Sequence, residues 1–481
     1  MPESIEKVAG SPGLDLALVL LLVGMMNTHL VTGSRFFRDQ GRGKLHAGYW
    51  VRILTVDEVS SALESAWAEL ESRSLEPNAY LSPHFVLPAI RHLDPRARVF
   101  LVFVGTGSPS SADLAGVGVF RSVPATRSFP LPHLLAYQSR HAFLSGLLIE
   151  RERAPEALDA LFNYLHATRW RWHGLEFRDT YGDGLLSELV RAAATQRGML
   201  QHVWNRRSRA TLVPAENREA LDAVLGSRDP KRCMRRLQER GKVSWTLHRQ
   251  GGIPEQAVEA FLELEHRGWK GESKTSLRSN PMAEAFFREV VSRFGVSGRA
   301  FFTELALDDR VIASTSNFIS GHAGFAFKIG WLPELAKMSP GVLNELEFIR
   351  HIHQECSDLL FLDSGASEGS YMDELWPNRR SVVSMAITST RVSRSAFAFV
   401  QTAREAKRRL QAFRSPARLK VCRNAAGTGL CQCRTGSSRC GSRVSFPVVD
   451  TSKVDFGAAS GLGRNARGGT WPRLSWGRSV L

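Results

Sequence analysis

The order of strands and helices expected between Phe301 and Asp363 limits the possible folds more than any other feature of this 481-residue chain. Three apolar strands are expected in succession, joined by short turns: 301–307, 311–319 and 323–330. A helix from Pro340 to Gln354 and a buried strand from Leu359 to Asp363 follow them. A helix that links two neighbouring strands of one sheet makes those strands parallel. The pattern therefore predicts an antiparallel meander that ends in a βαβ crossover.

The first half of the chain shows a similar order of elements. Its expected helices are 58–72, 85–92 and 155–168, and its expected strands are 99–104, 114–120, 143–149 and 175–177. Two helices, 254–266 and 281–294, precede the meander of the second half. We therefore predict an α/β fold with a duplicated unit. The expected segments are a poorly ordered extension (1–47), two domains (48–215 and 216–400), and a basic helix end with a disordered tail (401–481). A basic helical segment at 217–242 would link the domains.

The net charge of +16 comes mostly from the tail. Residues 411–481 hold twelve Lys or Arg against two Asp, which is +10, and this leaves +6 for residues 1–410. The charge of the body therefore does not indicate a nucleic-acid partner, and no DNA is expected. Four of the six cysteines also lie in the tail, at spacings that match no common zinc pattern, so no metal is predicted.

Cysteine use and hydropathy suggest a cytoplasmic protein. The folded body contains only Cys233 and Cys356, far apart in sequence, which is typical of a reducing compartment. The apolar run from Leu14 to Met26 has thirteen residues, whereas a membrane-spanning helix needs about twenty. We therefore expect no stable membrane span.

The tripeptide Ser339, Pro340 and Gly341 is the first chemical signal. Serine is a common helix cap, proline fits a first helical turn, and glycine lets a ligand approach the backbone. Free amides and the helix dipole favour an anion such as a pyrophosphate at this position. A well-capped helix without a ligand is the structural alternative.

Polar and aromatic residues also gather in the loops that leave the expected sheet. They are Glu265, His266, Trp269, Lys270, Lys328, Asp363, Tyr371, Trp376 and Arg379. Ligands of α/β sheets collect at strand ends, so these side chains are candidates for one site. Each also has a structural alternative, such as an exposed Lys328, a packed Trp376 or a turn at Asp363.

In this order, these residues resemble the CelD-type acetyltransferases of the GNAT superfamily, which are related to FemAB-like transferases. The matching stretches are 261–265, 268–271, 286–289, 324–329, 339–343 with Glu347, 349–350, 363–364, 372, 375–377 and 379–380. A weaker likeness extends to about 48–400 and includes Asn78, Ser82, Pro83 and 141–149. The resemblance implies two tandem GNAT-like units, each a mixed, mostly antiparallel sheet with a βαβ crossover, the first of them degenerate.

The resemblance also implies transfer of an acyl group, in the first place acetyl, from acyl-CoA to an amine or hydroxyl acceptor such as a sugar or small molecule. Ser339, Pro340, Gly341 and Val342 would hold the acyl-CoA co-substrate. Tyr371 would protonate the leaving thiolate, and Glu265, His266 and Asp363 are alternative bases. Trp269, Lys270, Lys328, Trp376 and Arg379 would bind the acceptor.

One loop departs from the family pattern. Gly365 and Ser370–Tyr371 stand where the family has a cysteine and a histidine, and the loop is one residue shorter. Two other functions stay open: a catalytically inactive GNAT-like scaffold in a polysaccharide-synthesis assembly, and a FemAB-like transferase that uses charged tRNA. Polysaccharide or cell-envelope biosynthesis is the setting that the resemblance suggests.

Overall fold

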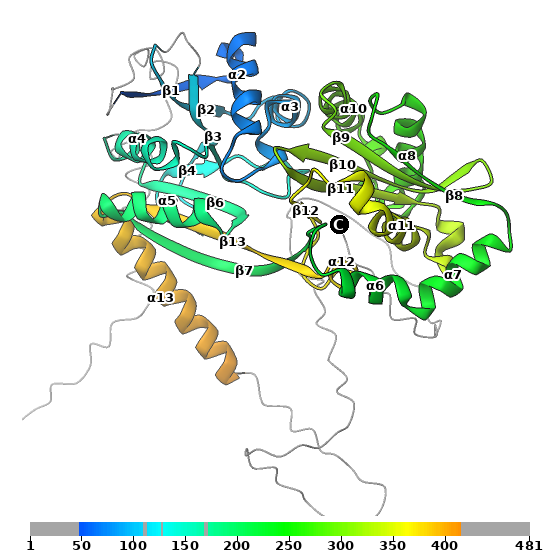
Figure 1. Cartoon of the computed structure of the whole chain (residues 1–481). Coiled ribbons are helices and arrows are strands. Elements are labelled where there is room, and N and C mark those ends of the chain that lie inside the picture. Colours follow the sequence, from blue (N-terminus) through cyan, green and yellow to red (C-terminus); the bar gives the residue numbers. More distant parts are fainter. Residues whose placement is uncertain (1–47, 109–112, 127, 168–171, 415–481) are drawn as a thin grey trace, which may run out of the picture. The chain divides into compact units, whose positions relative to one another are not determined.

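The computed structural model of this protein describes residues 48–108, 113–126, 128–167 and 172–414 (Figure 1). The predicted N-terminal extension and nearly all of the predicted tail lie outside the described residues. By its internal contacts the chain divides into a large unit, residues 1–404 with 478–481, and a small one, residues 405–477. The described part of the small unit, 405–414, is the end of helix α13 (Arg391–Arg414). All further elements belong to the large unit.

The two halves of the large unit are each built from both helices and strands. The first half contains β1 (Tyr49–Thr55), α2 (Ser61–Ser72), α3 (Pro83–Pro88), β2 (Val99–Thr106), β3 (Asp113–Val123), β4 (His133–Ala136), β5 (Leu147–Ile149), α4 (Ala154–Ala167), β6 (Gly174–Tyr181), α5 (Leu185–Gln196) and β7 (Leu200–Leu212). The second contains α6 (Arg218–Gly226), α7 (Arg228–Gln238), β8 (Val243–His248), α8 (Glu255–Arg267), α9 (Trp269–Glu272), α10 (Pro281–Val296), β9 (Ala300–Leu307), β10 (Arg310–Ser320), β11 (Ala323–Trp331), α11 (Pro340–Glu355), β12 (Phe361–Asp363), α12 (Met372–Leu375) and β13 (Asn378–Thr388). Shorter helical turns cover Val56–Glu58, Ala79–Leu81, Ala89–Leu93, Leu277–Ser279 and Pro333–Met338.

The predicted α/β fold class with two crossovers is confirmed. Strands β9, β10 and β11 form the antiparallel meander, and β12 then pairs parallel to β11 after the α11 crossover. In the first half, β4 likewise pairs parallel to β6, with α4 between them in sequence. The strands of the described residues form a single sheet in the order β1-β2-β3-β4-β6-β13-β7-β12-β11-β10-β9-β8, with β5 on β3.

The two halves exchange their last strands. Strand β7 of the first half pairs with β12 of the second, and β13 of the second half pairs with β6 of the first. β7 and β13 also pair with each other at the centre of the sheet. The proposed boundary at residues 215 and 216 lies between β7 and α6. This exchange joins the two halves into one continuous sheet, because each half's part of the sheet includes a strand from the other half.

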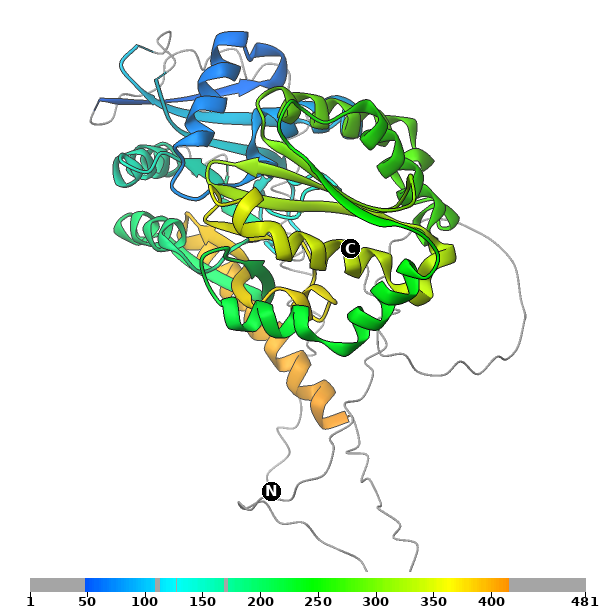
Figure 2. The same ribbon diagram turned by 45° about the vertical axis from the view of Figure 1, so that its right-hand side comes forward.

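Helices cover both faces of the second half's sheet (Figures 1 and 2). Helices α8 and α10 lie on one face of β9–β11, and α11 lies on the other. The α8–α10 face contributes to a hydrophobic core that also contains α2 and α3 of the first half. Phe85 of α3 and Phe286 of α10 meet edge to face there, with ring centroids 5.3 Å apart. A further core packs α6, α7 and α11 together.

Corresponding strands of the two halves differ at one point. In β11 a single extra residue, Phe327, forms a bulge, because Ser316 pairs with Lys328 and Asn317 with Ala326. In the first half the same place holds a ten-residue loop, residues 137–146, between β4 and β5, which both pair with β3. The strand predicted at 143–149 was therefore wrong in its first four residues, which belong to this loop.

The described part of the chain has no helix that is both long and apolar enough to span a membrane.

Candidate functional site

The edges of β11 and β12 open into a gap. The strands pair through only three residues, and the last pair joins Phe325 to Asp363. Beyond it β11 continues to Trp331, whereas β12 ends at Asp363. A small cavity of ≈ 20 Å³ lies at this divergence, room for about one water molecule. Its lining is Thr315, Asn317, Ala326, Phe327, Lys328, Ile329, Glu345, Ser364, Tyr371 and Met372.

The amino end of α11 lies next to the open part of β11. A side chain at Gly341 would come within 3.1 Å of Ile329 Cδ1 and 3.3 Å of Trp331 Cδ1, so the helix start packs closely on the strand. Ser339 stands at the cap position, but the prediction that its side chain caps the helix was wrong. Its backbone is left-handed (φ 48°, ψ 55°), whereas capping serines are usually extended, and it makes no side-chain capping bond. The first amides of α11 therefore receive no cap from Ser339 and remain suited to an anion.

Tyr371 and Glu345 approach the cavity from the α11 face of the sheet. Burial raises the pKa of Tyr371, and the Glu345 carboxylate acts in the same direction, so the phenol keeps its proton at neutral pH. Burial also raises the pKa of Glu345 to about 7. Glu345 Oε2 has no hydrogen-bond partner among the described residues. The sequence analysis gave Glu345 no role, although it lies four residues after Gly341, one turn along the same helix.

Glu265 and Lys270 form a buried pair on the α8 face of the sheet. Glu265 Oε2 accepts a hydrogen bond from the Leu277 amide at 2.7 Å, and Oε1 lies 3.5 Å from Lys270 Nζ, an ion pair without a hydrogen bond. The Lys270 ammonium also donates to the Ile329 carbonyl at 3.4 Å. Burial lowers the pKa of Lys270, and the Glu265 carboxylate opposes that shift.

Lys328 belongs to the same face. Side chains alternate along β11: Ile329 faces Gly341 of α11, while a side chain on Gly330 would collide with the Glu265 amide of α8 at 2.6 Å. Part of Lys328 reaches solvent, yet its ammonium is enclosed well enough that burial lowers its pKa to about 8. The positive charge of Lys270 adds to that shift.

The long loop of the first half completes this face. The Phe143 ring lies so close to Gly365 that a side chain there would come within 2.6 Å of it. His141 stacks on Phe286 with ring centroids 5.7 Å apart, and its pKa falls to about 2 through burial and then through Lys328, Arg140 and Lys270. The sequence analysis included 141–149 in a weak likeness but assigned these residues no role. Gly365, which departs from the family pattern, makes room for Phe143.

The comparisons with known proteins agree with this geometry. Residues 226–369 match the family model described as "Acetyltransferase (GNAT) domain". This stretch of the second half is therefore similar to a GNAT acetyltransferase domain, and we call it the GNAT domain. The match includes α11 and β12 and ends before Tyr371, Trp376 and Arg379. No curated protein sequence matches the chain.

Several solved structures are similar to the chain at low identity. A conserved protein of unknown function from Bacteroides thetaiotaomicron VPI-5482 has a TM-score of 0.45 and 10% identity, over 69% of this chain and 98% of that one. FemX has a TM-score of 0.44 and 10% identity, over 67% and 95%. A tandem GNAT protein from the clavulanic acid biosynthesis pathway has a TM-score of 0.36 and 15% identity, over 70% and 98%. Similarity at this level indicates no substrate.

Two of the three alternative bases of the GNAT domain are engaged in other contacts. Asp363 accepts a hydrogen bond from the Tyr181 hydroxyl at 2.6 Å and one from the Gly365 amide at 2.7 Å, and Arg209 lies 3.4 Å away. His266 is exposed, and its Nδ1 lies 2.8 Å from Ser276 Oγ. Glu265 differs from both because one of its oxygens, Oε1, has no hydrogen bond.

The structure does not bring every expected acceptor residue to Lys328 and Lys270. Trp376 is buried in the core beneath α11, near Glu345. Arg379 is exposed and donates to backbone carbonyls of Asp373 and Asn378. The side chain of Trp269 lies outside what the structure describes.

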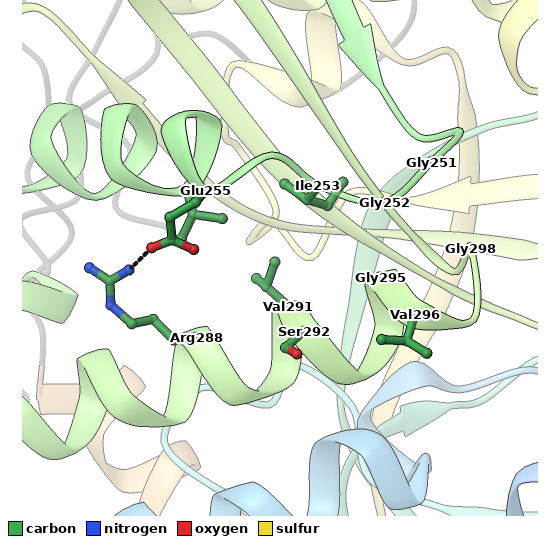
Figure 3. Close-up of a pocket in the computed structure, with 11 residues that line it drawn as sticks. Gly251, Gly252, Ile253, Glu255, Arg288, Val291, Ser292, Gly295, Val296 and Gly298 are labelled. Atoms are coloured by element: carbon green, nitrogen blue, oxygen red, sulfur yellow. Dashed lines mark hydrogen bonds and ion pairs between the residues drawn. The ribbon is translucent and has the colours of Figure 1, made fainter.

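A larger pocket lies elsewhere on the GNAT domain (Figure 3). It has a volume of ≈ 490 Å³ and is formed by the loop before α8 and the end of α10. Its walls are mainly glycine and valine, and Arg288 at its edge bonds to Glu255 at 2.7 Å. No residue assigned to the site from the sequence lines it. Among the described residues, no group of three or more His, Cys, Asp or Glu side chains could hold a metal ion.

Proposed function

We propose that this chain is an acyltransferase that moves an acyl group, in the first place acetyl, from acyl-CoA to an amine or hydroxyl acceptor. The observation that supports this function best is the opening between β11 and β12, beside the amino end of α11 that Ser339 does not cap. An exposed strand edge offers backbone donors for a thioester carbonyl, and the helix start offers donors for a pyrophosphate. The family match over residues 226–369 supports the same function.

The donor side of the proposed site consists of Ser339, Pro340, Gly341 and Val342. The amides of Gly341 and Val342 would bind the diphosphate of CoA, and the tight Gly341 contact with β11 leaves no room for a larger side chain. When bound, acyl-CoA supplies the activated acyl group. Tyr371, whose raised pKa keeps it protonated, would hold the proton that the leaving thiolate needs.

The acceptor side lies across the sheet, at Glu265, Lys270 and Lys328. Glu265 is our proposed base, because Oε1 has no hydrogen bond and lies 3.5 Å from Lys270 Nζ. We propose that Asp363 positions the end of β12 through its bonds to Tyr181 and Gly365. Of the other expected acceptor residues, Trp269 remains a candidate for shaping this pocket, whereas Trp376 is buried in the core beneath α11 and Arg379 donates to backbone carbonyls.

Binding of acetyl-CoA tests the donor site directly. A ligand at one hundred times its Kd stabilises a protein by about 2.7 kcal/mol, so acetyl-CoA should raise the melting temperature of the native chain. Gly341→Asp should abolish the rise, because a carboxylate at this point repels phosphate and collides with Ile329 and Trp331. Gly226→Asp is the matched control, since Gly226 has open space around it. No rise in the native chain, or an equal rise in Gly341→Asp, would contradict the proposed donor site.

Turnover separates the enzyme from its alternatives. A scaffold that lost catalysis would bind acetyl-CoA without releasing thiol in the presence of any acceptor. The tRNA-dependent alternative depends on the basic helix α7, where Arg232 and Arg235 are already paired with Asp229 and Glu239. Strongly salt-dependent RNA binding that survives deletion of 411–481 would favour that alternative. The CelD-type resemblance and the cysteine use lead us to propose a cytoplasmic role in polysaccharide or cell-envelope biosynthesis.

A further inference from the structure

Both halves of the chain contribute charged side chains to one seam. Lys328 comes from β11 and Lys270 from α9, while Arg140 and His141 come from the loop between β4 and β5 of the first half. The His141 ring and Lys328 Nζ both lie against the Phe327 ring, 6.4 Å and 5.2 Å from its centroid, and Lys328, Arg140 and Lys270 each lower the pKa of His141. The seam borders the gap at the end of the β11–β12 pairing, because Phe143 of the same loop packs against Gly365.

The charges in this seam are not balanced. Lys328, Lys270 and Arg140 supply three positive charges, Glu265 supplies one negative charge, and His141 is neutral, which leaves +2. Glu265 pairs with Lys270 at 3.5 Å. Neither Lys328 nor Arg140 has an ion pair or hydrogen bond to any residue that the structure describes; Lys328 Nζ lies only over the ring of Phe327, 5.2 Å from its centroid.

An enclosed ammonium without a partner is costly, so proteins rarely keep one without a use for it. A second polar group in the seam is also unpartnered: His141 Nε2 is buried and has no hydrogen bond. Two groups from different halves, neither with a hydrogen-bond partner among the described residues, thus lie against the same ring, that of Phe327. The loop that brings His141 there is fixed by several bonds, among them Arg209 to the Phe143 carbonyl at 3.1 Å and the Ser145 amide to the Asp179 carbonyl at 2.9 Å.

We propose that the acceptor carries an anionic group, a carboxylate or a phosphate, which binds in this seam to Lys328 and Arg140 with His141 beside it. The inference rests on the proposed acyl transfer and names its substrate class. The anion anchors the acceptor on the α8 face, and its amine or hydroxyl then faces the gap between β11 and β12, next to Glu265. The first half thereby acts as an acceptor-binding module for the GNAT domain of the second.

Inorganic phosphate and acetate are direct probes of the seam. The full chain is first saturated with coenzyme A, which fills the donor site, and then titrated with either anion against chloride at equal ionic strength. Phosphate, acetate or both should raise the melting temperature of the native chain. The rise should be lost in Lys328→Met and reduced in Arg140→Met, while Lys231→Met, which alters an exposed lysine of α7, should keep it. No rise with either anion in the native chain, or an equal rise in Lys328→Met, would overturn the proposal.

Matched acceptors test the same inference in turnover. Glycine is compared with glycinamide, glutamate with glutamine, and glucosamine 6-phosphate with glucosamine, with thiol release from acetyl-CoA as the readout. In any pair that reacts, the anionic member should have a kcat/KM at least about tenfold higher, since charge-assisted hydrogen bonds are worth about 1.5–3 kcal/mol. Lys328→Met should bring the ratio close to one through KM. A preference for the neutral member would refute the anion site.

The two proposals fail in different ways. If coenzyme A does not bind, the proposed function fails, and the phosphate and acetate titrations of the unsaturated chain still decide the anion site. If coenzyme A binds and the anions have no effect that depends on Lys328, the anion site fails alone.

Discussion

Replacement of Lys328 by methionine should make the protein more stable while it weakens acceptor binding. Methionine has nearly the same length and no charge, so it removes the enclosed ammonium without a large cavity. The ordinary pKa of lysine is 10.5, and burial lowers that of Lys328 to about 8. At about 1.36 kcal/mol for each pKa unit, the difference means that the charged form costs the fold about 3 kcal/mol.

This cost depends on pH in a defined direction. The pKa of Lys328 is lower in the folded chain, so the unfolded chain binds more protons between pH 8 and 10.5, and the stability of the native protein rises over that range. Below pH 8 both states are protonated and the cost is complete. Above pH 10.5 both are neutral and the cost is absent. The gain from Lys328→Met should therefore be largest at pH 7 and should vanish near pH 11.

Thermal unfolding followed by circular dichroism measures the effect. With about 2.1 cal/mol/K of unfolding entropy per residue and roughly 360 described residues, about 3 kcal/mol corresponds to a rise of about 4 °C. Lys231→Met, at an exposed position, should change stability by less than about 0.5 kcal/mol. Either of two results would refute this explanation: Lys328→Met melts at or below the native temperature at pH 7, or it is still more stable than the native protein at pH 11. In either case the charged Lys328 ammonium is not what destabilises the fold.

Three further substitutions test other parts of the site. Tyr371→Phe should lower kcat by about 10²–10⁴-fold and leave the Kd of acetyl-CoA unchanged, because only a proton donor is lost; weaker binding with normal turnover would exclude that role. Glu265→Gln should lower kcat by a similar factor and also lower the melting temperature, since the amide oxygen still accepts from Leu277 but the buried Lys270 ammonium loses its counter-charge; full activity would exclude Glu265 as the base. Glu345→Gln should stabilise the fold by about 3 kcal/mol above pH 7 and hardly at pH 4.5, because the cost of the raised pKa of Glu345 grows as the pH rises from 4.5 to about 7 and is complete above it; equal melting temperatures of both proteins at pH 8 would contradict this.

The local pattern of the sequence was enough to predict the second half's meander and crossover. The largely apolar stretches Phe301–Leu307 and Ala323–Gly330, with the helix start at Pro340, are signals that act within a few residues. The same is true of the proposed donor side, since Gly341 belongs to the first turn of α11 and the helix start fixes where its amides point. One local prediction there was wrong: the Ser339 side chain does not cap α11, and the backbone of Ser339 is left-handed.

The exchange of β7 and β13 could not be predicted in this way. Both strands carry many polar residues, so neither shows a clear apolar alternation, and nothing in a strand's own sequence names its partner across the chain. The acceptor side shows the same limit. Lys328 lies about 190 residues after Arg140 and His141 in the sequence. Only the packing of the first half against α8–α10 brings these residues together.

The sequence by itself thus determined the α/β class, the crossover and the residues at the start of α11, because these follow from short-range periodicity, turn chemistry and backbone freedom. Tertiary structure alone decided which face each charged side chain occupies, which of the alternative bases keeps an oxygen without a hydrogen bond, and that Phe143 of the first half packs against Gly365 beside the candidate site. The physical reason is that desolvation and charge pairing depend on every group packed around a side chain, and most of those groups come from distant parts of the chain.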